Sequence, residues 1–257
     1  MILMSWPRPI KFGFSILNNY LVYTQYFLVM IRSRSQNALQ VLLLLISFNS
    51  FSQQPGSYKI LNDKVIIYPD VKLSGGAKTI QVQVMNDNII RVTASPGQDI
   101  YTPKSLSVIL QPQATTSQIK EDKGKVVITT TFKTIIEPLS GNISFADLNG
   151  NDLIKEKKIT GRKISPVVFE GTPLYNLSQD FELTDDDAVY GLGQHQDDVW
   201  NYKGRQVLFF QNNTEIAIPF LVSIKNYGLF WDNYSLTKAG DVRSYQPLTS
   251  QIGRAHV

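Results

Sequence analysis

The fold class is decided by residues 79–93, which read Thr79-Ile-Gln-Val-Gln-Val-Met-Asn-Asp-Asn-Ile-Ile-Arg-Val-Thr93. From residue 80 to residue 84 apolar side chains alternate with polar ones, which is the two-residue period of a strand with one buried face. Turn-forming residues at positions 86–88 separate this run from a second run rich in β-branched residues. The stretch therefore predicts a tight β-hairpin.

The same pattern extends outward from this hairpin. Runs rich in β-branched residues also occupy residues 65–68 and 126–132, and turn-forming segments lie at residues 123–124, 139–142 and 147–150. We find no helical period longer than about two turns. Many short strands at short spacing are typical of an antiparallel sandwich. We therefore expect residues 53–251 to form an all-β domain, an antiparallel β-sandwich.

Composition excludes several classes of function. The 257 residues contain no Cys, so a disulfide framework, a thiolate metal site and a cysteine nucleophile are ruled out. The net charge of +4 comes from the two ends, because residues 53–251 hold 20 of the 25 Lys and Arg residues and all 21 acidic ones. A chain without a basic stripe in its folded part is not expected to bind nucleic acid. With no Walker loop and no metal-ligand spacing, we expect no cofactor and no metal.

The N-terminal segment has the order of a secretory signal. Arg32 and Arg34 precede an apolar run at residues 41–48, and Ser50 and Ser52 form a small-x-small cleavage pattern. Residues 30–52 are therefore predicted to be a signal peptide, cleaved near Ser52–Gln53, which sends the protein to the periplasm or outside the cell. The alternative is a membrane anchor at residues 38–51, whose apolar core is about half of the ~20 residues that a spanning helix needs.

The two ends of the chain read as artefacts. Residues 1–29 are rich in aromatic residues without a clear period, so we expect mistranslated upstream DNA and an initiator at Met30. Residues 252–257 read Ile-Gly-Arg-Ala-His-Val, which is what ATCGGAAGAGCACACGTC encodes, a string found in common sequencing adapters. We therefore expect the natural polypeptide to continue past residue 251 with other residues.

Residues 188–241 hold most of the chemically suggestive side chains. The segment Gly191-Leu-Gly193 lacks the third glycine of a dinucleotide-binding fingerprint, so its plain interpretation is a strand that bends or admits another backbone. His195 is more typical of a structural hydrogen bond than of a catalyst. Acidic runs at residues 185–187 and 197–198 suggest either calcium or solvated loops. The aromatic residues are either sugar-stacking platforms or core side chains; they are Trp200, Tyr202, Trp231 and Tyr234.

Three segments of this block resemble a known family. Residues 190–193 (YGLG), 213–220 (NTEIAIPF) and 227–235 (YGLFWDNYS) are similar to the N-terminal domain of glycoside hydrolase family 31, closest to its bacterial α-xylosidase-like members. The resemblance covers residues 58–251 and is strongest in the last quarter. It implies a sandwich of the galactose-mutarotase-like type, which packs on a (β/α)8 barrel and sends one loop to the rim of the sugar pocket.

The resemblance also implies where the chemistry lies. The family's nucleophile sits in a W-x-D-M-N-E signature on a barrel strand, and this chain contains no such string. Retaining hydrolysis needs two carboxylates about 5–5.5 Å apart, so we expect no catalytic residue here and an inactive fragment. The full-length protein is expected to be an exported retaining α-glycosidase, an α-xylosidase acting on xyloglucan oligosaccharides. The alternative is a stand-alone carbohydrate-binding β-sandwich without activity.

The rim loop is predicted from the polar run at residues 211–215, which separates two apolar runs. A loop from a neighbouring domain can supply amides for hydroxyls and aromatic faces for sugar rings. We expect Gln211 and Asn212 to bind substrate, with Trp200 and Tyr202 as walls of the site. The plain alternative is an ordinary turn. The face around Trp200, Phe209, Phe210 and Trp231 is expected to rest on the missing (β/α)8 barrel.

Overall fold

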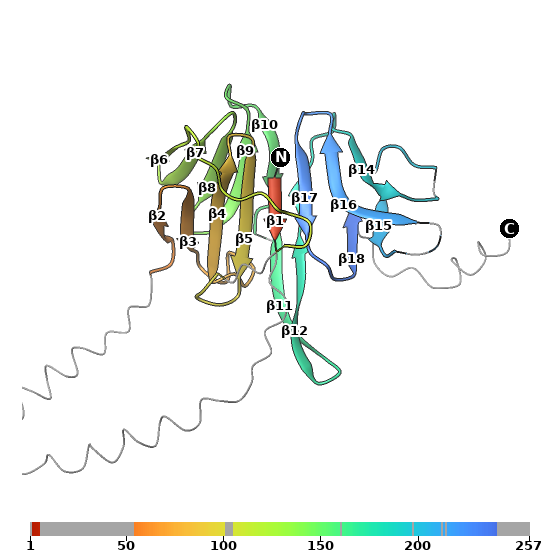
Figure 1. The fold of residues 1–257 in the computed structure, drawn as a ribbon. Helices are drawn as coiled ribbons and strands as arrows, with labels where there is room; N and C mark the ends of the chain where they lie inside the picture. Colours follow the sequence, from red (N-terminus) through yellow and green to blue (C-terminus); the bar gives the residue numbers. More distant parts are fainter. Residues whose placement is uncertain are drawn as a thin grey trace, which may run out of the picture. The chain divides into compact units, whose positions relative to one another are not determined.

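The computed structural model describes residues 54–100, 105–159, 161–196, 198–211, 213 and 215–240, together with the backbone of residues 2–5. Every regular element in these ranges is a strand (Figure 1). The first nine are β1 (Ile2–Ser5), β2 (Ser57–Ile60), β3 (Lys64–Tyr68), β4 (Thr79–Asn86), β5 (Ile89–Ser95), β6 (Gln118–Asp122), β7 (Lys125–Thr129), β8 (Lys133–Glu137) and β9 (Asn142–Ala146). The others are β10 (Asp152–Glu156), β11 (Arg162–Phe169), β12 (Thr172–Gln179), β13 (Phe181–Glu182), β14 (Val189–Gln194), β15 (Gln206–Phe209), β16 (Ile216–Ser223), β17 (Gly228–Asp232) and β18 (Thr237–Gly240).

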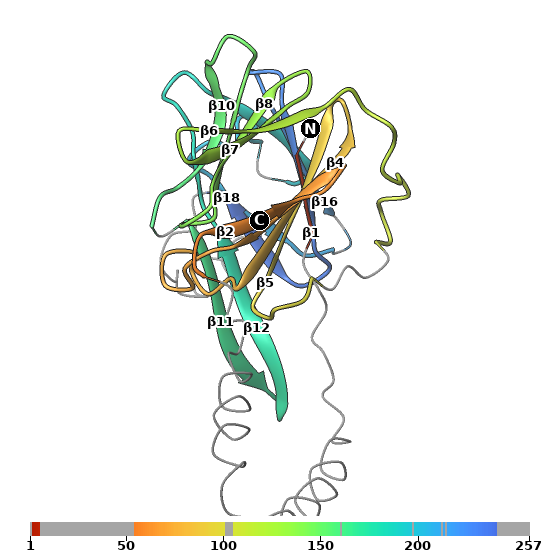
Figure 2. The same cartoon turned by 90° about the vertical axis from the view of Figure 1, so that its left-hand side faces the viewer.

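Two large sheets face each other as a sandwich (Figures 1 and 2). The eight-stranded sheet has the order β14-β16-β17-β1-β5-β4-β3-β2, and the six-stranded sheet has the order β13-β10-β9-β8-β7-β6. Buried side chains of both sheets form one core; among them are Val65, Ile80, Val92, Ile128, Ile136, Phe145 and Ile154. The prediction of an all-β sandwich is confirmed.

The hairpin predicted from residues 79–93 is present. Strands β4 and β5 pair antiparallel, with Val82 opposite Val92. Asp87 and Asn88 make the turn, in which the Asn88 N–H donates to the side-chain oxygen of Asn86 at 2.9 Å. β4 is more buried than its alternation predicts, because even the polar Gln81 is covered.

One strand was not expected. β1 lies between β5 and β17 and runs parallel to both, although the ladders β2–β3, β3–β4, β4–β5, β14–β16 and β16–β17 of the same sheet are antiparallel. The sequence prediction assigned no folded structure to residues 1–29. The predicted signal peptide (residues 30–52) and the final residues 252–257 lie outside the described ranges.

Two smaller ribbons complete the described chain. β11 and β12 form a hairpin whose turn residues, Glu170 and Gly171, both have positive φ, as a two-residue type I′ turn requires. Its tip, Pro166–Tyr175, belongs to a second compact unit. β15 and β18 pair antiparallel. No helix within the described ranges is long and apolar enough to cross a membrane.

Candidate functional site: the loop between β14 and β16

The loop between β14 and β16 comprises residues 195–215 and includes the short strand β15. It starts from a bulge in β14. Gly191, Leu192 and Gly193 have φ values of 101°, 66° and 107°, and the register with β16 shifts between the two glycines. A Cβ on Gly193 would lie 1.9 Å from the backbone oxygen of Ile216. Only glycine tolerates this approach in this conformation, which confirms the prediction of a bend with a close backbone. The bulge turns the buried Leu192 into a small apolar cluster beneath the loop.

His195 closes the base of the loop. Its side chain is buried, with Nε2 3.0 Å from the backbone oxygen of Leu192 and Nδ1 3.8 Å from a carboxylate oxygen of Glu215. The ring meets that of Tyr202 edge-on, with centroids 6.2 Å apart. These contacts join the two ends of the loop, so the structural interpretation of His195 accounts for its position.

The first half of the loop is held by main-chain and side-chain hydrogen bonds. The Tyr202 N–H donates to the backbone oxygen of Val189 at 2.8 Å. The Asn201 side-chain oxygen accepts from the N–H groups of Val189 and Lys203, each at 3.0 Å. The Lys203 ammonium donates to the backbone oxygens of Thr184 and Asp185. A loop fixed in this way is preorganised, so side chains that it exposes are held ready for a ligand or a neighbouring domain.

The predicted site residues fall into three groups. Trp200 is 85% exposed and stands out from the anchored loop. Tyr202 is only 6% exposed, so it supports the loop from below and does not form an open wall, which differs from the expectation. Gln211 is exposed, and its side-chain oxygen accepts from the Ala217 N–H at 3.3 Å. Asn212 lies outside the described residues.

An exposed apolar face lies beside this loop. We call Tyr190, Ile216, Ile218 and Val222 the apolar face; all four are exposed, and Tyr190 and Val222 stand opposite each other on β14 and β16. The alternate residues of β16 share one side of the sheet. Residues 216–222 are apolar without interruption, so a strand here carries apolar side chains on both sides of the sheet; this signal was in the sequence, yet sequence reasoning missed the face.

The face predicted from the sequence, around Trp200, Phe209, Phe210 and Trp231, differs from this apolar face. Trp200 and Phe210 are exposed as expected. Phe209 packs against the small cluster beneath the loop, and Trp231 packs against the main core. Both side chains are partly buried, so at these two positions the chain itself covers part of the face that was expected to rest on the barrel.

Tyr227 begins residues 227–235, one of the three segments that carry the family resemblance, and its side chain has a structural role. The Tyr227 hydroxyl and the Ser223 hydroxyl both donate to the buried carboxylate of Asp187, at 3.1 and 2.5 Å. Burial is the main cause that raises the pKa of Tyr227, and the nearby Asp187 charge adds to it. Asp187 is therefore held inside the fold. Within the described ranges no group of three or more acidic or histidine side chains could hold a metal ion.

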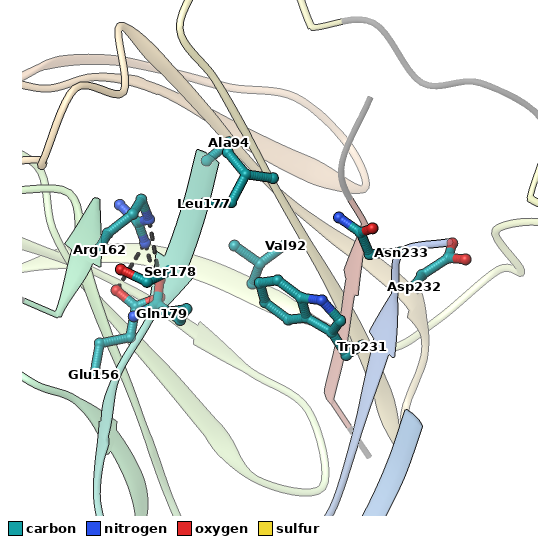
Figure 3. A pocket seen from close by; sticks show the side chains of 10 residues that line it. All are labelled: Val92, Ala94, Glu156, Arg162, Leu177, Ser178, Gln179, Trp231, Asp232 and Asn233. Atoms are coloured by element: carbon teal, nitrogen blue, oxygen red, sulfur yellow. Dashed lines mark hydrogen bonds and ion pairs between the residues drawn. The ribbon is translucent and has the colours of Figure 1, made fainter. Parts of the chain in front are cut away.

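A cavity opens between the two sheets (Figure 3). Val92 and Trp231 lie on one side, and the charged pair Glu156 and Arg162 lies on the other with Gln179. The cavity volume is about 20 Å³. This is room for about one water molecule and far too little for a sugar ring.

The charged pair in this cavity stabilises the sandwich. The Arg162 guanidinium lies 2.7 and 2.8 Å from the two carboxylate oxygens of Glu156, and it also donates to the Gly141 backbone oxygen at 3.2 Å. The Ile143 N–H donates to the same carboxylate at 3.0 Å. Burial raises the pKa of Glu156, while Arg162 and the Ile143 N–H oppose that shift. The pair therefore ties Arg162 at the start of β11 to strands β9 and β10 of the six-stranded sheet, which is a structural explanation for it.

Comparison with known proteins gives the family context. A family model described as the glycosyl hydrolase 31 N-terminal galactose mutarotase-like domain matches residues 79–238. An α-xylosidase of Saccharolobus solfataricus is 35% identical over 175 residues, which cover 63% of this chain and 23% of the relative. The chain thus spans about a quarter of that relative's length.

Solved structures agree with this match. The crystal structure of a GH31 α-xylosidase from Xanthomonas citri has a TM-score of 0.66 and 38% sequence identity, covering 74% of this chain and 20% of that one. A GH31 α-xylosidase from a soil metagenome, complexed with xylose, has a TM-score of 0.60 at 20% identity, covering 72% and 29%. At 20% identity, the likeness to the metagenome enzyme shows a shared fold alone.

Proposed function

Because the chain belongs to glycoside hydrolase family 31 and matches its N-terminal galactose mutarotase-like domain, we propose that it is the non-catalytic N-terminal part of an exported retaining α-glycosidase. The proposed activity of the whole protein is that of an α-xylosidase acting on xyloglucan oligosaccharides. The observation that carries this choice is that the relatives at 35% and 38% identity are both α-xylosidases.

The carboxylates of the described residues support a non-catalytic role. A retaining glycosidase needs two carboxylates about 5–5.5 Å apart across an open cleft. Glu156 is buried against Arg162, and Asp187 is buried against two hydroxyl groups. The cavity beside Glu156 is too small for a sugar. The catalytic pair is therefore proposed to lie on a (β/α)8 barrel in the part of the polypeptide that follows.

The loop between β14 and β16 is proposed to reach the rim of the sugar pocket. Trp200 offers an exposed aromatic face, which suits a sugar ring. Gln211 offers a side-chain amide two residues after the end of β15, and Asn212 is proposed as a second donor beside it. Tyr202 takes a supporting role in this proposal, since it is buried under the loop.

The apolar face is proposed to contact the barrel. Large exposed apolar patches mark interaction sites, and this one lies beside the proposed rim loop. The alternative of a stand-alone carbohydrate-binding sandwich would leave Tyr190, Ile216, Ile218 and Val222 in water. Secretion through the predicted signal peptide at residues 30–52 completes the proposal and places the enzyme outside the cytoplasm.

The test is to extend the reading frame and assay its product. The polypeptide from Gln53 to its natural stop should contain a barrel with the W-x-D-M-N-E signature and should release xylose from xyloglucan oligosaccharides. A protein that ends shortly after residue 251 and binds oligosaccharides without cleaving them would overturn the enzyme assignment. Mass spectrometry of exported protein that retains residues 30–52 would overturn the secretion step alone.

A further inference from the structure

The eight-stranded sheet depends on its fourth strand. β5 and β17 are separated by β1, which pairs with both: Arg91 and Phe230 lie opposite Leu3, on its two sides. In the sheet order no other strand joins β14-β16-β17 to β5-β4-β3-β2 (Figure 1). Among the described strands, β5 and β17 are therefore the two walls of a gap that is one strand wide.

Side chains of the two walls meet across this gap. The Arg91 guanidinium lies 3.4 Å from a carboxylate oxygen of Asp232, whose side chain is 3% exposed. Walls separated by one strand stand roughly 9.6 Å apart, twice the usual strand spacing. An ion pair that spans this distance holds the gap at the width of a single strand, whichever strand fills it.

The inner side of the gap also has an unused donor. Val92 and Trp231 lie at the same register level, the one occupied by Met4, and both line the cavity between the sheets. Within the described residues the buried Trp231 Nε1 has no hydrogen-bond partner. A buried donor normally finds an acceptor, and a polar side chain at the level of Met4 would supply one.

The residues that match the family model include β5 and β17, the two walls of the gap, but not β1. The family match runs from residue 79 to residue 238 and therefore contains β5 and β17 but excludes residues 2–5. Added strands are held chiefly by main-chain hydrogen bonds, which accept many sequences. The pairing of Ile2–Ser5 with both walls therefore shows that the gap accepts a strand, and it does not show that this particular segment is required.

We propose that the gap between β5 and β17 is a strand-acceptor site, filled in the full-length, signal-processed protein by a strand from the polypeptide that follows Gly240. Cleavage near Ser52–Gln53 would remove β1. A parallel strand after β17 needs a crossover of about a dozen residues or more, which the chain beyond Gly240 can supply, since the match covers only 20–23% of the α-xylosidase relatives. The inference rests on the proposed function only in requiring that the polypeptide continue.

Hydrogen exchange on the exported full-length enzyme tests whether the gap is filled. Amides of Ile89–Ser95 and Gly228–Asp232 should exchange at least about 100-fold more slowly than unstructured peptides, including those that face the gap. Exchange at unstructured rates by the gap-facing amides of both strands would mean an empty gap and would overturn the proposal. This readout needs no substitution and is independent of xylose release, which tests the proposed function separately.

Photo-crosslinking identifies the strand. Benzoylphenylalanine in place of Phe230, on a wall of the gap, should crosslink within one chain to a peptide beyond residue 240. The same substitution at Phe220, which pairs with Phe230 on the side away from the gap and lies between Ile218 and Val222 of the apolar face, should crosslink to a different peptide, one from the proposed barrel. Crosslinks from position 230 to residues 2–5, to another part of residues 54–240 across the gap, or to a second copy would each overturn the proposal. Crosslinks are interpreted only when the substituted enzyme keeps the hydrogen-exchange pattern of the unsubstituted enzyme. If no substituted enzyme keeps that pattern, hydrogen exchange alone decides.

Discussion

Two apolar clusters in this domain differ in how completely the chain itself covers them. The main core lies between the two sheets and takes buried side chains from both, such as Ile80, Ile128 and Phe145. The small cluster beneath the β14–β16 loop has three buried members, Leu192, Tyr202 and Val207. Around the small cluster, Trp200 and Phe210 remain exposed.

The difference shows where the described residues cover their own apolar surface. In the main core, apolar side chains of the two sheets bury one another. The region of β14 and β16 has one covered side and one exposed apolar face. A monomeric domain seldom leaves such a face in water, so this region is where we expect the rest of the enzyme to pack.

The largest effect is expected from breaking the buried charge pair of the first region. Arg162→Met leaves the Glu156 carboxylate buried without its partner, which should lower the local free energy of unfolding by about 3–5 kcal/mol. Site-resolved hydrogen exchange in urea measures it. The control is Lys125→Met, whose 3.0 Å pair with Glu137 is 48% and 31% exposed, where about 0–1 kcal/mol is expected. Equal losses would contradict the structural role of the buried pair.

A smaller loss is expected from the bulge that starts the loop. Gly193→Ala places a Cβ against the Ile216 backbone oxygen at a φ of 107°, so the β14–β16 region should lose about 1–3 kcal/mol. Gly204→Ala is the matched control, because Gly204 also has positive φ but has nothing within 4 Å of its Cβ position. If Gly204→Ala costs as much, strain alone explains the effect and the close approach does not matter.

The exposed apolar face should govern the behaviour of the isolated chain. Ile216→Lys with Ile218→Lys should increase the soluble monomer fraction of the fragment, measured by size-exclusion chromatography, because it removes an uncovered apolar patch. The control pair, Ile60→Lys with Leu61→Lys, is similarly exposed but lies in and next to β2. A wild-type fragment that is already monomeric, with a sharp reversible thermal transition, would favour a stand-alone binding module.

The smallest effect is expected at the rim. Gln211→Ala in the full-length enzyme removes one hydrogen bond to a sugar hydroxyl, about 0.5–1.5 kcal/mol, which is roughly a 2- to 13-fold fall in kcat/KM. The control Gln118→Ala changes an exposed amide on β6. Unchanged kcat/KM for Gln211→Ala would remove this residue from the site, whereas a sharp fall in melting temperature would make it structural through its bond to Ala217.

The fold was predictable from local patterns where those patterns were complete. The hairpin at residues 79–93 follows from alternation and turn residues. The run at residues 126–132 was predicted as one strand, but β7 ends at Thr129 and the next three residues turn, because the Thr130 N–H donates to the Phe132 backbone oxygen. β-Branched residues favour strands and do not show where a strand turns back.

The site was less predictable than the fold. Trp200 and Tyr202 lie two residues apart in an irregular loop, yet one is exposed and the other is buried. A strand or helix period would have distinguished them, and a loop has none. Their difference comes from contacts that the loop makes when it folds back on its own start, the Val189 hydrogen bond and the His195 ring, and no periodic pattern encodes such contacts.

The central claim is that this domain belongs to an α-xylosidase whose catalytic carboxylates lie outside it. The most direct measurement is xylose release from xyloglucan oligosaccharides by the full-length protein and by the purified 257-residue chain, at equal concentrations. The account predicts saturable release by the full-length protein and none by the chain. Saturable release of xylose by the chain itself would contradict it.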